Sequence, residues 1–159
     1  MTCNLAVAAA LLFASEPSAV SAAPAAEMAA SPVSAEPAFK AITDEAASLK
    51  SLASQWLSPP YLTQSELTTD AGFIDFSQRI SALAQANMAA HLDMRQRGTD
   101  GDLTCILRGI AEDLPVKLAA IEAASAGDER KLALEEMVYL LNDNVEVILA
   151  PPHNPSSAR

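Results

Sequence analysis

The stretch FIDFSQRISALAQANMAAHLDMRQR, residues 73–97, carries the clearest structural signal in this chain of 159 residues. Its bulky side chains recur at the spacing of an α-helix, so they share one face. That inner stripe consists of Phe76, Ile80, Leu83, Asn87, His91 and Met94. Gly98 follows the stripe and is a typical helix stop, because glycine readily adopts the left-handed conformation that ends many helices. The pattern predicts one long amphipathic helix over residues 73–97.

A second block with the same periodicity precedes it. Residues 38–57 repeat apolar side chains at helical spacing, and the helix must end before Pro59 and Pro60, which cannot continue it. The join that follows contains Thr63-Gln64-Ser65-Glu66, which has the spacing of a capping box. We expect this motif to start one extra helical turn.

Two more blocks follow residue 97. The third begins after Asp102, a residue type favoured at helix N-caps, and is interrupted by Pro115. We expect the helix to kink at this proline rather than to end there. The fourth block follows the turn at Gly127 and runs to Ala150.

Four amphipathic helices with mostly short joins predict the fold class. An antiparallel four-helix bundle buries all four apolar stripes at once. The sequence therefore predicts an all-α domain over residues 38–150, with its third helix kinked near Pro115.

The chain ends have a different composition. Residues 5–13 form a short apolar run, and small residues gather at 18–23, which is the order of a secretory signal over residues 1–22. A Pro/Ala-rich spacer, residues 23–37, follows it, and residues 151–159 form a proline-rich tail that we expect to be disordered. The predicted location is the periplasm of a bacterium.

The role of the cysteines depends on this leader. Cys3 lies inside the predicted signal, so the exported protein keeps Cys105 alone. Cys105 lies next to core-type positions, and we expect it to be a buried small apolar side chain. The alternative is a disulfide between two chains, which would make a homodimer through Cys105.

Charge and hydropathy exclude several partners. The chain has 10 Lys and Arg against 20 Asp and Glu, a net charge of −10 at pH 7. No basic cluster offers the positive surface that nucleic acid or anionic lipid requires. No stretch reaches the roughly 18 consecutive apolar residues of a membrane span, so we expect none.

The motifs of common bundle chemistries are absent from the sequence. There is no Cys-x-x-Cys-His, no Glu-x-x-His pair, no His-Glu-x-x-His and no Gly-rich phosphate loop. The two histidines, His91 and His153, leave a Ser or Cys nucleophile without an evident oriented base. We expect a protein that is not an enzyme and requires no cofactor.

One group of side chains could bind a soft metal ion or haem. Met88, His91 and Met94 are three residues apart on a helix, so two thioethers and an imidazole lie close together. These ligands suit Cu(I) or Ag(I), and haem with His91 and Met137 as axial ligands is a further option. The competing interpretation is structural, because Met fills cores and a buried polar pair of Asn87 and His91 would fix the helix register.

Positive charge is concentrated around the loop Gly98-Thr99-Asp100-Gly101. Arg95, Arg97 and Arg108 lie around it, which makes them candidate partner-binding residues. Asp93, Asp100 and Asp102 lie beside them, so a neutral, salt-bridged and solvated loop is the alternative.

The leading hypothesis for function follows from these exclusions. It is a non-enzymatic periplasmic protein that binds a protein partner through an acidic helical face, as an envelope accessory factor, a chaperone-like adaptor or an immunity-type inhibitor. The alternative is a periplasmic carrier of copper, silver or haem built on Met88, His91 and Met94.

Overall fold

The computed structural model describes residues 32–98 and 101–151. Its elements are η1 (Pro32–Ala35), α1 (Pro37–Trp56), α2 (Pro59–Thr63), η2 (Leu67–Thr69), α3 (Ala71–Arg97), α4 (Gly101–Ala123) and α5 (Asp128–Leu149). Every regular element in these two ranges is helical, which confirms the all-α prediction. None of their helices has the length and apolar character of a membrane span.

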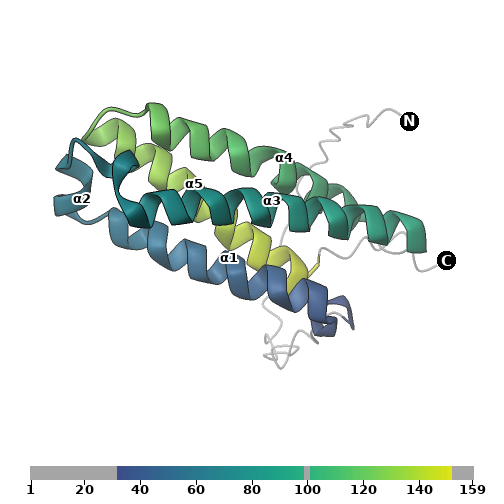
Figure 1. Cartoon of the computed structure of the whole chain (residues 1–159). Helices are drawn as coiled ribbons and strands as arrows, with labels where there is room; N and C mark the ends of the chain where they lie inside the picture. The colour runs from purple at the N-terminus through teal and green to yellow at the C-terminus, as the bar shows by residue number, and fades with distance from the viewer. Residues whose placement is uncertain (1–31, 99–100, 152–159) are drawn as a thin grey trace, which may run out of the picture.

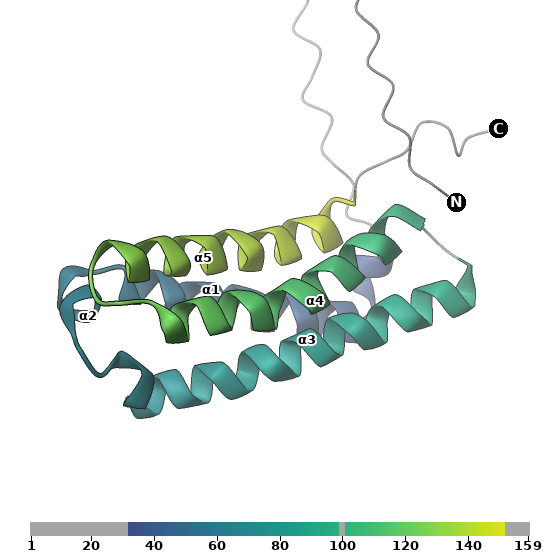
Figure 2. The ribbon, with the colours of Figure 1, turned by 90° about the horizontal axis from the view of Figure 1, so that it is seen from above.

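The four long helices form the predicted antiparallel bundle (Figure 1, Figure 2). Consecutive long helices run in opposite directions, each packs against the next one in the chain, and α5 returns to lie against α1. The α3/α4 and α1/α5 seams are the most extensive, while the α1/α3 seam is thinner. In this order α3 and α5 face each other across the bundle.

The predicted inner stripes fill the core between these helices. Trp56 at the end of α1 packs against Phe73 and Phe76 at the start of α3, with ring centroids 5.6 and 4.9 Å apart. Burial of such apolar surface is the main driving force for the bundle. Two polar residues of α5, Arg130 and Asn144, also occupy buried positions that hydropathy does not reveal.

The helix ends follow from local chemistry. Gly98 has a φ of 66°, the left-handed conformation expected of the residue that ends α3. At the other end of α3, the Asp70 carboxylate accepts a hydrogen bond of 2.8 Å from the Gly72 amide. Pro59 and Pro60 end α1, as predicted, and then serve as the first residues of α2, where proline is well tolerated.

α4 passes through Pro115 as one helix, as predicted. Proline has no amide hydrogen to donate to the carbonyl of Ala111, one turn earlier, and the helix is bent along its length in Figure 2. The start of this helix differs from the prediction. Asp102 lies inside the first turn of α4, where its charge complements the helix dipole, and is not the N-cap.

The predicted capping box is wrong. Thr63 is the last residue of α2, and its hydroxyl donates a 3.0 Å hydrogen bond back to the Pro59 carbonyl. The reason lies in what surrounds the end of α2. The guanidinium Nη1 of Arg130 donates to the carbonyls of Tyr61, at 3.2 Å, and of Gln64, so these C-terminal groups are already satisfied.

The predicted burial of Cys105 is also wrong. Its side chain is exposed on α4, while the neighbouring Thr104 takes the buried position. Thr104 lies one turn before the buried Leu107 and one residue after Leu103, so the buried side of α4 is centred there. An exposed thiol does not by itself indicate a disulfide between two chains.

The predicted end segments lie mostly outside the described residues. The signal, residues 1–22, and the tail from residue 152 onward are among them. Of the predicted spacer, the structure describes its end, which forms η1. Pro151 follows α5 and is buried.

Candidate functional site

Two asparagines join α3 and α5 through the core. Asn87 Nδ2 donates to Asn144 Oδ1 at 2.9 Å, and Asn144 Nδ2 donates to Asn87 Oδ1 at 2.8 Å. Asn87 Nδ2 also donates to the Leu83 carbonyl at 3.0 Å. Both side chains are fully buried, so the amide pair links two helices that lie opposite each other in the bundle.

His91 makes a separate link, from α3 to α4. Its Nδ1 lies 2.7 Å from the Thr104 carbonyl oxygen, and since a carbonyl can only accept, Nδ1 carries the hydrogen. The predicted polar pair of Asn87 and His91 is thus replaced by two polar links, each to a different helix. The hydrogen bond accounts for the burial of His91 in structural terms.

The predicted soft-metal residues share one side of α3. His91 and Met94 are buried, and Met88 is half-buried one turn earlier. The hydrogen bond to Thr104 uses Nδ1 of His91, not Nε2. No group of three or more His, Cys, Asp and Glu in residues 32–98 and 101–151 is arranged to hold a metal ion. Copper, silver and haem binding stay predictions.

Of the predicted partner-binding arginines, Arg97 is engaged within the bundle. Its guanidinium makes two 2.8 Å hydrogen bonds to the Glu36 carboxylate and another to Asp93, so it ties the end of α3 to the start of α1. Arg108 pairs with Glu112 at 3.2 Å on the surface of α4, and Arg95 is exposed. Arg97 and Arg108 are thus each paired with a carboxylate of the chain.

Removing the Arg97 guanidinium should change two carboxyl titrations. Its hydrogen bonds lower the pKa of Glu36 and of Asp93 below their ordinary values of 4.5 and 3.8. A lowered folded pKa contributes stability above the unfolded value, and this contribution is lost as the pH falls through the folded value. In Arg97→Gln, a carboxyl ¹³C NMR titration should show both pKa values rising toward the ordinary ones. Unchanged values would contradict the assignment, and Arg108→Gln, which should leave both as they are, is the control.

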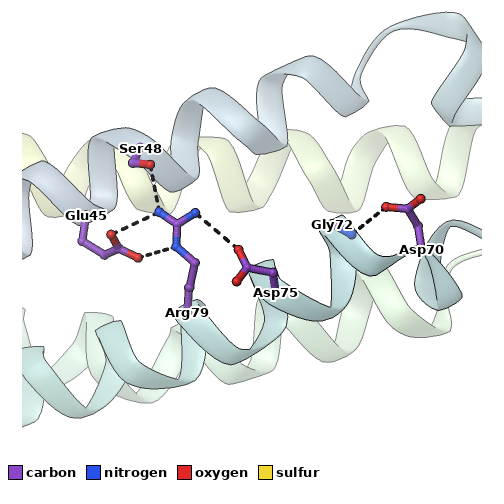
Figure 3. Close-up of polar contacts among 6 residues, drawn as sticks. All are labelled: Glu45, Ser48, Asp70, Gly72, Asp75 and Arg79. Atoms are coloured by element: carbon purple, nitrogen blue, oxygen red, sulfur yellow. Dashed lines mark hydrogen bonds and ion pairs between the residues drawn. The ribbon is translucent and has the colours of Figure 1, made fainter.

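A second arginine closes the other part of the α1/α3 seam (Figure 3). Arg79 of α3 donates to both Glu45 carboxylate oxygens, at 2.7 and 3.1 Å, and to the Ser48 hydroxyl at 2.8 Å. Between Arg79 and Arg97 lies a hollow of about 650 Å³ lined mainly by alanines. Its two carboxylates, Glu45 and Asp93, already pair with these arginines, so the hollow offers only apolar contact.

The outer side of α4 and α5 has a different character. We call it the α4/α5 face and define it by its lining residues Asp113, Lys117, Ala120, Ala123, Glu129, Leu132, Glu136, Tyr139 and Asp143. Two hollows, of about 520 and 290 Å³, lie along it, and Glu136 lines both. Leu132 is 58% exposed and Tyr139 69%, which is high for side chains of this size.

Carboxylates dominate the charge of this face. Its single basic residue, Lys117, makes a 2.7 Å ion pair with Glu136. Burial and the nearby Glu146 charge raise the pKa of Asp143, because both disfavour its ionised form. The exposed Leu132 and Tyr139 that accompany these carboxylates are not among the predicted partner-binding residues.

No family model, no curated protein and no solved structure matches this chain. The candidate site therefore depends on the geometry of the chain itself.

Proposed function

We propose that this chain is a non-enzymatic periplasmic protein that acts by holding a protein partner on its α4/α5 face. The observation that carries the proposal is the exposure of Leu132 and Tyr139 beside two hollows with a carboxylate rim. Exposed aromatic and aliphatic side chains are typical anchors of protein interfaces, and the charged rim selects the partner. An envelope accessory factor, a chaperone-like adaptor and an inhibitor would each work by such occupation of a partner surface.

Site-specific photocrosslinking tests this proposal. A photoreactive amino acid replaces Tyr139 in cells that produce the chain, and the matched control replaces Ile74, which is 48% exposed on α3. We expect a discrete adduct with one protein from position 139 and none from position 74. Equal labelling from both positions, or no adduct from position 139, would contradict the proposal. The mass of the recovered chain also shows whether residues 1–22 have been removed, as periplasmic export requires.

A further inference from the structure

The exposed side of α5 has a repeat of its own. Glu129, Leu132, Glu136, Tyr139, Asp143 and Glu146 follow one another at alternating spacings of three and four residues. All are exposed except the half-buried Asp143. This is the spacing at which one helix packs along another in a coiled coil. The stripe lies outside the bundle, so no helix within the described residues covers it.

α4 supplies the second wall of the same surface. Asp113, Val116, Ala120 and Ala123 are exposed and follow one another at three- and four-residue spacing on the adjacent helix. The two alanines line the smaller hollow beside Leu132, and Asp113 lines the larger one beside Tyr139. Small side chains on this wall allow a third helix to approach both α4 and α5 closely.

We infer that the partner element on this face is an amphipathic helix with a Lys or Arg at every seventh residue and apolar side chains between them. The inference rests on the proposed function. Glu129, Glu136 and Asp143 are seven residues apart, so they match basic groups at that interval. Leu132 and Tyr139 are two helical turns apart, about 10.5 Å, which matches apolar residues at positions i and i+7.

The negative charge of the stripe favours a basic helix over a second copy of the chain, anionic lipid or nucleic acid. In a second copy of the chain, the same stripe would oppose carboxylates to carboxylates, which is unfavourable. Anionic lipid and nucleic acid are repelled for the same reason. Lys117 pairs with Glu136 alone among these carboxylates, so Glu129 and Asp143, seven residues to either side of Glu136, remain for the basic groups of an incoming helix.

Synthetic peptides test the inference on the full chain. The probe is a helical peptide of about three heptads with Lys and Leu alternating at three- and four-residue spacing. One control peptide has the same composition in shuffled order, and another has Glu in place of Lys. By fluorescence anisotropy, we expect the shuffled peptide to bind about tenfold more weakly than the probe and the Glu peptide not to bind.

Variants of the chain locate the binding. Tyr139→Ala and Glu136→Gln should each weaken the probe about tenfold, while Ile74→Ala should leave it unchanged. On binding, an NMR titration should show a fall in the pKa of Asp143, because a neighbouring cation favours its ionised form. Equal affinity of the ordered and shuffled peptides, or equal effects of Tyr139→Ala and Ile74→Ala, would overturn the inference. So would dimerisation of the chain in sedimentation that Tyr139→Ala abolishes.

The outcomes also separate this inference from the proposed function. A crosslinked partner at position 139 together with failed peptide binding would leave the α4/α5 face as the binding site and reject the basic helix. Specific peptide binding without any crosslinked protein would reject the cellular partner and keep the recognition of a basic helix.

Discussion

Replacing Asn144 with alanine should lower the free energy of unfolding by about 3 kcal/mol, measured by urea denaturation followed by circular dichroism. In the wild-type core, the Asn87 amide donates one hydrogen bond to Asn144 and accepts one from it. The variant removes both of these hydrogen bonds and leaves the Asn87 amide buried. An unsatisfied buried polar group costs about 1–3 kcal/mol, and the cavity left by the truncated side chain adds to this.

The matched control removes both amides. Because leucine is close to asparagine in size, Asn87→Leu combined with Asn144→Leu should recover most of the lost stability. This follows from the asymmetry between losing one hydrogen-bonding partner and losing both. If the double variant is as unstable as Asn144→Ala, packing rather than the amide pair is the source of the effect.

The second large effect should come from Arg130→Met, with a loss of about 2 kcal/mol in unfolding free energy. Arg130 is 4% exposed, and its Nη1 donates to the carbonyls of Tyr61 and Gln64, which the variant leaves without this donor. Met keeps most of the apolar stem, so the loss reports mainly on the hydrogen bonds. Removing a buried charge offsets part of the cost.

Hydrogen exchange can show whether Arg130→Met destabilises one part of the bundle or the whole of it. Hydrogen exchange should accelerate in residues 58–70, which contain α2 and η2, more than in the middle of α1. Arg79→Met, at a more exposed arginine on the α1/α3 seam, is the control and should leave exchange in residues 58–70 unchanged. Uniform acceleration along the whole chain would show that Arg130 supports the entire bundle rather than this corner.

The fold was predictable because the apolar periodicity and the helix-breaking residues indicate the same helix boundaries in this chain. The stripe from Phe76 to Met94, the stop at Gly98 and the breaks at Pro59 and Pro60 each depend on one helix alone. Features that depend on neighbouring helices were missed. Thr63 ends a helix instead of starting one because Arg130, more than sixty residues away, binds the carbonyls there.

The candidate site was less predictable, for a related reason. α5 has two stripes at three- and four-residue spacing, and the inner one runs through Arg130, Leu134, Met137, Leu141, Asn144 and Ile148. Hydropathy identifies the inner stripe by Leu134, Met137, Leu141 and Ile148, but it does not show that Leu132 and Tyr139 stay exposed on the outer stripe. Once α1 and α4 cover the inner stripe, Leu132 and Tyr139 are left outside, and their exposure marks which acidic surface is the candidate interface.

The closure of the bundle by α5 has a consequence for the order in which the chain can fold. α1 packs most extensively against α5, which lies at the other end of the described sequence. A polypeptide is synthesised from its N-terminus. The apolar stripe of α1 therefore lacks its main partner until the 22 residues of α5 have been synthesised. Contacts between α3 and α4 are local in sequence and can form early, whereas the α1/α5 seam closes a long loop and must wait for the last helix.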